Sequence, residues 1–206
     1  MELKRKTKNK SWFIIIGSLL FLIGIGLIGY DYYSNKQIDK KEDELLKEFY
    51  VVQDKIETTD EPQNIEEVKE QVKINYVAVL KIPKINLERG LVNPNSYLNN
   101  IDYNVQILNN SAMPDERNGN VMLAAHSGNA RVSYFRNLDK LSINDEVSID
   151  YKGHTYTYKV VNIYDIDKTG KAQIIRNKNT NTLTLVTCRH NTNRQIVVIC
   201  ELTNTK

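Results

Sequence analysis

The sequence predicts a mostly β protein, a closed or nearly closed barrel of short strands that follows one N-terminal transmembrane helix. From Tyr76 onward, short runs rich in β-branched and aromatic residues succeed one another with turn residues between them and few helical patterns. Before them, Trp12 to Tyr30 is a nineteen-residue run without a charge, close to the ~20 helical residues that cross a bilayer. With 206 residues and 41% apolar content, the chain suffices for one globular domain and an appendage.

The N-terminal segment has the features of an uncleaved signal anchor. A basic tail, residues 1–11, precedes the apolar run 12–30 and favours a cytoplasmic N-terminus, which leaves the rest of the chain extracellular. A cleaved signal peptide is the competing interpretation, but the run exceeds the usual ~7–15 apolar residues and Ile28-Gly29-Tyr30 is a poor cleavage site. Gly24, Gly26 and Gly29 spell G-x-G-x-x-G without the strand that a dinucleotide site requires, so we interpret them as membrane-helix residues.

The mixed charge of residues 31–75 predicts a partly helical stalk or linker. The stretch Thr58 to Pro62 is expected to interrupt it. The globular domain is expected at residues 76–206. The net charge of +3 is small and is not arranged as a basic face with interleaved aromatic residues. Nucleic-acid binding is therefore not expected.

The barrel strands are expected where apolar and β-branched residues cluster. They are Tyr76 to Ile82, Val105 to Leu108, Asn120 to His126, Glu146 to Tyr151, Thr155 to Asp165, Leu183 to Cys188 and Arg194 to Leu202. Pro83 interrupts the first of them before Ile85-Asn86-Leu87. Asp150 to His154 has the composition of a hairpin turn, and short helices are expected at Ser96 to Ile101 and Ser133 to Leu141.

The chemistry of the chain is expected at Thr184-Leu185-Val186-Thr187-Cys188 and Arg194. A cysteine attacks as its thiolate, which needs a cationic neighbour at neutral pH. Of the three histidines, His126 ends a strand and opens onto a barrel rim, whereas His154 lies in a hairpin turn and His190 in a polar loop. His126 is therefore the expected partner of Cys188.

Arg194 and Cys200 each have two interpretations. Arg194 is either a surface charge at a strand edge or a fixed cation whose donors stabilise a tetrahedral oxyanion. Cys200 lies within the apolar run from Ile196, which is typical of a buried core residue. A disulfide between Cys188 and Cys200 is the structural alternative for both thiols.

The segment Thr184 to Cys188 resembles the T-L-x-T-C signature of sortases, the membrane-anchored cysteine transpeptidases of Gram-positive bacteria. The anchor, the histidine about sixty residues before the cysteine and the arginine opening the last strand agree in order, over roughly Tyr76 to Leu202. The resemblance implies an eight-stranded sortase β-barrel with His126, Cys188 and Arg194 as catalytic residues. Thr187 and Arg194 are expected to contact the substrate.

The resemblance also implies the reaction and its partners. Cys188 would attack the Thr–Gly bond of an LPxTG-like sorting signal, and an amine of a cell-wall precursor or of a pilin lysine would resolve the thioester. The alternatives are a pilin-polymerising enzyme and a non-catalytic envelope-binding module. The sequence departs from classes B and C, because it lacks room for a long helical insertion before Thr184 and has no Asp-Pro-aromatic lid motif, so a class A, D or E-like sortase is expected. Asp165 and Asp167 resemble a calcium loop only weakly, and we predict no metal and no cofactor.

Overall fold

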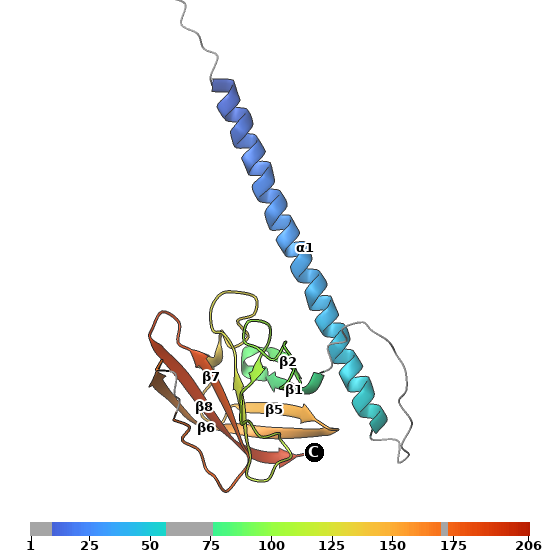
Figure 1. The fold of residues 1–206 in the computed structure, drawn as a ribbon, viewed down its shortest axis with the longest axis vertical. Helices are drawn as coiled ribbons and strands as arrows, with labels where there is room; N and C mark the ends of the chain where they lie inside the picture. The colour runs from blue at the N-terminus through green and yellow to red at the C-terminus, as the bar shows by residue number, and fades with distance from the viewer. Residues whose placement is uncertain (1–9, 57–75, 170–172) are drawn as a thin grey trace, which may run out of the picture. The chain divides into compact units, whose positions relative to one another are not determined.

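The computed structural model describes residues 10–56, 76–169 and 173–206. The first helix, α1, runs without interruption from Lys10 to Ile56 (Figure 1). Its stretch Trp12–Ser34 is long and apolar enough to cross a membrane, and none of it is buried inside the protein. An apolar helix at this place is consistent with a membrane anchor or a signal. Most of the predicted basic tail and the predicted break at Thr58 to Pro62 lie outside the described residues.

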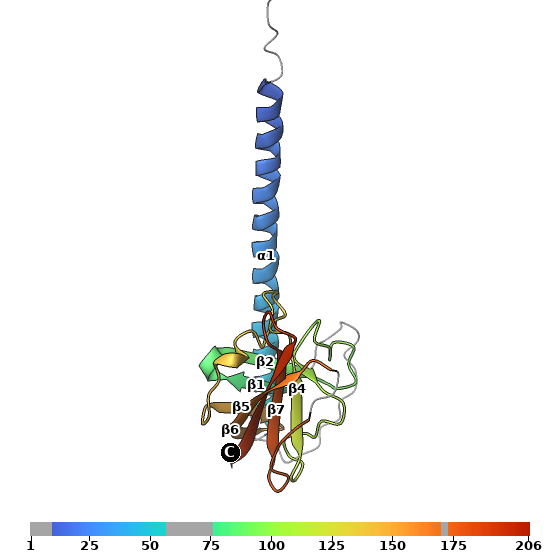
Figure 2. The same cartoon turned by 90° about the vertical axis from the view of Figure 1, so that its left-hand side faces the viewer.

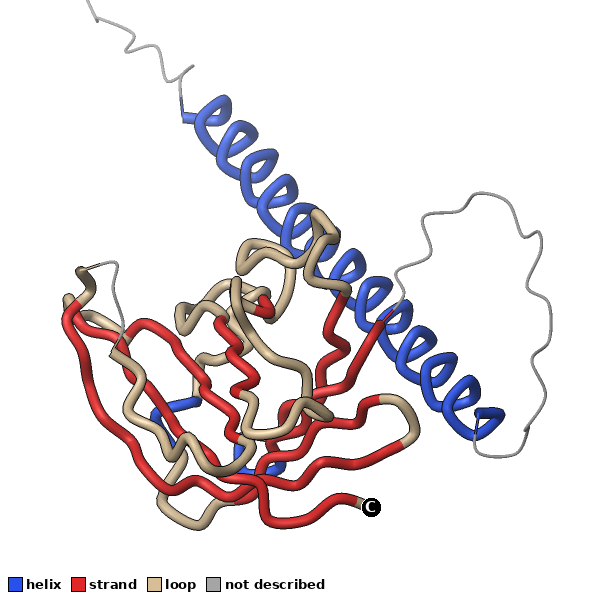
Figure 3. The backbone as a smooth tube through the Cα atoms, turned by 60° about the horizontal axis from the view of Figure 1, so that its bottom comes forward, coloured by secondary structure: helices blue, strands red, loops and turns tan. Residues whose placement is uncertain are grey.

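The chain divides into two compact units, Met1–Glu44 and Leu45–Lys206, and the second contains the barrel. The eight strands are β1 (Tyr76–Ile82), β2 (Leu87–Val92), β3 (Gln106–Ile107), β4 (Asn120–Ala124), β5 (Glu146–Tyr151), β6 (His154–Asp167), β7 (Thr182–Cys188) and β8 (Arg194–Thr205). They form one sheet in the order β2-β1-β5-β6-β8-β7-β4-β3. The two end strands, β2 and β3, approach each other, so the sheet curls into a nearly closed eight-stranded β-barrel (Figures 2 and 3).

Strand pairing brings the ends of β4 and β7 together. Every pairing in the sheet is antiparallel except that of β4 with β7, which is parallel. The β5–β6 hairpin confirms the predicted turn, with Lys152 and Gly153 at φ 49° and 81°. Two successive positive φ angles give the twist that two antiparallel strands need across a two-residue turn.

The core fills the barrel interior from alternate residues of nearly every strand. Its largest fully buried side chains are Tyr158, Phe135, Leu80, Ile82, Leu91, Leu123, Leu138, Ile149, Leu183, Leu185 and Ile196. A second, smaller cluster joins Val186, Val197 and Ile199 with Tyr164, Ile166 and Ile174. Because side chains alternate along a strand, Leu185 of β7 packs in the main core and Val186 packs in the second cluster.

Two predicted helices are wrong in whole or in part. The predicted helix at Ser96 to Ile101 is a series of turns, and of Ser133 to Leu141 only Leu138–Lys140 forms a 3-10 helix, η2. In the first segment polar side chains bind nearby backbone instead: Asn99 donates to the Ile107 carbonyl at 2.9 Å and accepts from the Ile107 amide at 2.7 Å. Such bonds compete with the helical ladder.

Strand β2 was missed, and β3 and β4 are shorter than predicted. Polar and glycine residues, Glu88, Arg89 and Gly90, interrupt the β pattern of β2. The structure shows why glycine stands there, because a Cβ on Gly90 would collide with the ring of Tyr76 on β1. β4 ends at Ala124, two residues before the predicted end at His126.

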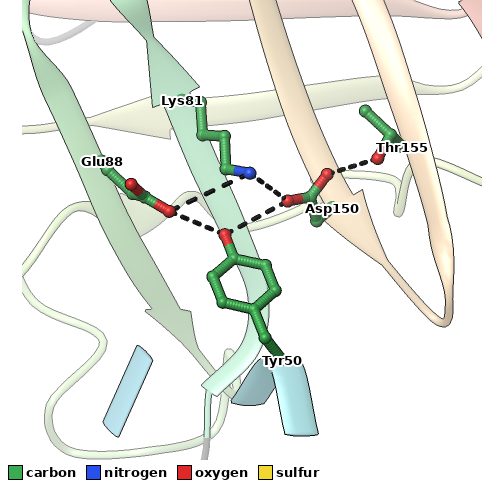
Figure 4. Close-up of polar contacts among 5 residues, drawn as sticks. All are labelled: Tyr50, Lys81, Glu88, Asp150 and Thr155. Carbon is green, nitrogen blue, oxygen red and sulfur yellow. Dashed lines mark hydrogen bonds and ion pairs between the residues drawn. The ribbon is translucent and has the colours of Figure 1, made fainter. Parts of the chain in front are cut away.

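The end of α1, which belongs to the barrel unit, carries Tyr50 (Figure 4). The Tyr50 hydroxyl lies 2.7 Å from Oε1 of Glu88 and 3.2 Å from Oδ2 of Asp150. Lys81 Nζ pairs with Asp150 at 2.8 Å and lies 4.9 Å from the centre of the Tyr50 ring. Burial, together with the two carboxylates, raises the pKa of Tyr50 above its usual value. The phenol therefore stays protonated and can donate to either carboxylate.

Candidate active site

The parallel register of β4 and β7 sets Cys188 beside His126. Ala124 pairs with Val186 at the end of the ladder, and the Ala125 amide donates to the Val186 carbonyl at 3.4 Å. His126 follows Ala124 by two residues, and Cys188 follows Val186 by two residues. Counted along the two strands, His126 and Cys188 therefore stand opposite each other at the same end of the barrel.

Threonine hydroxyls hold β7 to β4 along this ladder. Thr182 and Thr184 each donate to Oδ1 of Asn120 at 2.9 Å, and all three side chains are buried. Thr187 donates to the Ala125 carbonyl at 2.6 Å. Buried hydroxyls need such partners, and these bonds fix the height of Cys188 relative to His126. The Thr187 hydroxyl is thus bound within the fold, and a substrate contact by Thr187 stays a prediction.

A carboxylate that the sequence did not reveal lies against His126. Nε2 of His126 is 3.1 Å from Oδ1 of Asp102, and the two side chains are 40% and 69% exposed. The segment with Asp102 is fixed by Asn104, whose amide donates to the Gly90 carbonyl at 2.9 Å and whose oxygen accepts from Arg89 Nε at 2.5 Å. Nothing local in the sequence marks Asp102, because it precedes His126 by 24 residues.

The six-residue step from Cys188 to Arg194 forms a closed loop. The Arg189 amide donates to the Arg194 carbonyl at 2.8 Å, and Asn191 turns the chain with φ 57°. Arg189 and Arg194 both donate hydrogen bonds to Asp165 of β6. Nε of Arg189 binds the Asp165 carboxylate at 2.7 Å, and Nη2 of Arg194 donates to the Asp165 carbonyl at 3.3 Å. Arg194 is exposed at the start of β8, next to Gln195, the strand partner of Cys188.

Two cavities share Cys188. One, of about 270 Å³, is lined by His126, Ser127, Gly128, Cys188, Arg189, His190 and Asn191. The other, of about 230 Å³, is lined by Ser127, Phe135, Arg136, Asp139, Thr187, Cys188, Arg189, His190, Thr192 and Ile196. Cys188 and His126 thus face one space, whereas Arg194 lines neither of these two cavities.

Cys200, His154 and His190 differ from Cys188 and His126 in their burial and position. Cys188 and Cys200 are both free thiols, so they do not form a disulfide. Cys200 is fully buried on β8, and burial raises its pKa to about 12. His154 is exposed at the start of β6 with its ring against Tyr156. His190 is exposed, as expected, but it lines both cavities at Cys188.

Asp165, which with Asp167 weakly resembles a calcium loop, pairs its carboxylate with Arg189. Across the described part of the chain, no three histidine, cysteine or acidic side chains gather as metal ligands would.

A half-buried thiol opposite a histidine, at the ends of two paired strands, is typical of cysteine-dependent acyl-transfer enzymes. Comparison with known proteins narrows this class. The sortase domain model matches residues 80–203, more than half of the chain. The chain belongs to the sortase family and is a cysteine transpeptidase.

Two sortases are similar to this chain over most of their length. Sortase A of Bacillus anthracis is 24% identical over 199 residues, which cover 89% of this chain and 91% of the relative. Sortase D of Bacillus subtilis is 28% identical over 178 residues, 82% of this chain and 86% of the relative. Among solved structures, the sortase D5 transpeptidase of Clostridium perfringens has a TM-score of 0.58 at 26% identity and covers 79% of this chain and 98% of its own.

A lid mutant of sortase A from Corynebacterium diphtheriae has the same fold, with a TM-score of 0.56 at 21% identity. The match covers 63% of this chain and 70% of the chain in that structure. The eight-stranded barrel predicted from the resemblance is therefore confirmed.

Proposed function

We propose that this sortase cleaves an LPxTG-like sorting signal at its Thr–Gly bond and transfers the released protein to an amine of the cell wall. Membership of the family implies sorting-signal substrates. The observation that carries the proposal is the β4–β7 register, which sets His126 opposite Cys188. Cys188, His126 and Arg194 are the proposed catalytic residues, and Thr187 and Arg194 are proposed to contact the substrate.

The first half of the reaction forms a thioester. The Cys188 thiolate attacks the threonine carbonyl, and the carbon–sulfur bond forms as the carbon–nitrogen bond to glycine breaks. The His126 imidazolium gives its proton to the leaving amine. The Arg194 guanidinium stabilises the negative oxygen of the tetrahedral intermediate. To do so, Arg194 must break its hydrogen bond to the Asp165 carbonyl. This is one hydrogen bond of 3.3 Å from an exposed side chain, so breaking it costs little free energy.

The second half releases the product. An amine attacks the thioester carbonyl, the new carbon–nitrogen bond forms, and the Cys188 thiolate leaves. Neutral His126 accepts the proton that the amine loses, which restores the starting ion pair.

The proposed location follows from α1. The apolar stretch Trp12–Ser34 anchors the chain in the membrane as a single pass, with the N-terminus in the cytoplasm and residues 76–206 outside the cell. Residues 31–75 are the proposed stalk or linker between them. The basic residues ahead of Trp12 support this orientation.

Replacing Arg194 tests the catalytic assignment. We expect Arg194→Ala to lower kcat/KM for an LPxTG-type peptide by about 100-fold or more, the usual cost of one oxyanion donor, while the Cys188 thiol remains open to alkylation. Arg117→Ala, which removes another exposed arginine, is the matched control. Turnover of Arg194→Ala near that of the control would exclude the oxyanion role.

A further inference from the structure

Of the two cavities at Cys188, the one that runs to Asp139 is not lined by His126. A transpeptidase must bring a second substrate to the thioester. The two cavities meet at Cys188, and they differ in several of the residues that line them. Thr187 and Ile196 line the Asp139 cavity, and Ile196 belongs to the main core. Val186, which shares the strand face of Cys188, packs in the second cluster.

Charge distinguishes the two spaces. Asp139, on η2, is the sole carboxylate among the side chains that line these two cavities. Two guanidinium ions line the same cavity, but both are bound elsewhere. Arg136 donates to the carbonyls of Gly128 and Ala130, each at 3.0 Å.

The other guanidinium, Arg189, pairs with Asp165 at 2.7 Å. Asp139, in contrast, has no hydrogen bond or ion pair within the described residues. The charge of Arg189 is offset by Asp165, whereas Arg136, bound to neutral carbonyls, keeps its positive charge. The exposed Asp139 carboxylate is thus the anionic group on a cavity wall that it shares with Cys188. An aliphatic ammonium ion is the ligand class that complements such a site.

We propose that this cavity is the acceptor site, and that Asp139 binds the ammonium form of the primary amine that resolves the thioester. This inference rests on the proposed function. The bound ammonium ion gives one proton to His126, which became neutral when it protonated the leaving amine. The freed amine then attacks the thioester carbonyl, the carbon–nitrogen bond forms and the carbon–sulfur bond breaks. The second proton of the amine goes to the departing Cys188 sulfur, which leaves as the thiol, and release of one proton to water restores the starting ion pair. Asp139 remains a carboxylate throughout, so it positions and concentrates the acceptor without taking a proton.

The test separates a charged acceptor from an uncharged one. The full chain is loaded with a sorting-signal peptide and resolved either by the side-chain amine of Nα-acetyl-lysine amide, which is an ammonium ion near neutral pH, or by hydroxylamine, which is uncharged there. We expect Asp139→Asn to raise KM for the lysine amine about three- to tenfold. Its hydroxylamine reaction and its thioester hydrolysis should stay within about twofold of wild type.

Matched variants keep the result interpretable. Glu146→Gln removes an exposed carboxylate on β5 outside the cavity and should leave KM for the lysine amine unchanged. Asp139→Glu retains the charge and should restore most of the affinity, which a merely structural role of Asp139 would not require. Equal KM values for Asp139→Asn and Glu146→Gln would overturn the proposal.

Failure of the proposed function is a separate outcome, in which the wild-type chain forms no thioester. The acceptor site is then tested directly by the rate at which iodoacetamide alkylates Cys188. The lysine amine should slow this alkylation in wild type but not in Asp139→Asn. Equal slowing in both proteins, or in neither, would refute the site.

Discussion

At the residue scale, the two thiols of the chain have opposite surroundings. Cys188 ends β7, is half-buried and faces two cavities. Cys200 is fully buried twelve residues later on β8. Burial stabilises the uncharged thiol and raises the pKa of Cys200 to about 12. Cys188 thus lines two cavities, whereas Cys200 is part of the main core.

The buried thiol makes stability depend on pH. Between its ordinary pKa of ~8.5 and about 12, Cys200 keeps its proton in the folded state and loses it in the unfolded state. The unfolded state then binds fewer protons, so this thiol lowers the free energy of unfolding as pH rises through that window. We expect Cys200→Ala to be less stable than wild type by about 1 kcal/mol near neutral pH and to lose less stability toward pH ~11.

Urea unfolding of both proteins at several pH values measures this difference. Taking the difference between the two proteins cancels the titration of groups that they share. A gap in stability that stays constant from neutral to alkaline pH would show that Cys200 does not titrate as its burial requires.

Asp102 is the second residue with a consequence of its own. A carboxylate 3.1 Å from Nε2 of His126 holds the ring in one orientation. Because both side chains are exposed, the pair contributes no more than about 1 kcal/mol. We expect Asp102→Asn to lower kcat/KM about two- to fivefold, mainly through kcat, with KM for the sorting peptide unchanged.

Asp115→Asn, which removes an exposed carboxylate paired with Lys152, serves as the control in peptide-cleavage assays. If Asp102→Asn cleaves the peptide as fast as this control, the contact with His126 has no catalytic consequence.

At the scale of elements, the clearest example is the end of α1. Tyr50 donates into a group of two carboxylates and one ammonium ion supplied by β1, β2 and β5 (Figure 4). Hydrogen bonds to charged acceptors contribute about 1.5–3 kcal/mol each, although partial exposure reduces this figure here. The phenol hydroxyl therefore stabilises the contact of this last part of the helix with the barrel.

Removing that hydroxyl should loosen the helix end and spare the barrel. In the full chain in detergent, we expect Tyr50→Phe to speed amide hydrogen exchange in residues 45–56 while exchange in β7 and β8 stays as in wild type. Tyr97→Phe removes a hydroxyl from a side chain that is 70% exposed and should change neither region. Unchanged exchange in residues 45–56 would mean that Tyr50 does not stabilise this contact.

The sequence predicted elements where the local pattern agreed with the final fold. β1, β5, β7 and β8 are runs of alternating or continuous apolar residues, and each begins at or within one residue of its predicted start. β2 was missed because polar residues and Gly90 interrupt its pattern, although that glycine is there for the Tyr76 ring. The helix predicted at Ser96 failed because asparagine and serine side chains bind the backbone there.

At the scale of the whole molecule, the site depends on contacts between distant segments. Strand ends and a family resemblance predict His126, Cys188 and Arg194 as candidates, and neither cue needs three-dimensional information. The parallel register that sets His126 opposite Cys188 joins segments more than sixty residues apart. Asp102 lies in a series of turns and Asp139 on the three-residue helix η2, and no periodic pattern in the sequence encodes the course of either segment. The sequence therefore predicts the catalytic candidates but not the charges around them.

The central claim is that Cys188 forms a thioester with a cleaved sorting signal. Intact mass spectrometry of the full chain incubated with an LPxTG-type peptide measures this directly. We predict an adduct equal to the peptide portion up to its threonine, on Cys188, released by hydroxylamine, absent in Cys188→Ala and retained in Cys200→Ala. No adduct on folded wild-type protein with any sorting peptide, or an adduct that survives in Cys188→Ala, would contradict it.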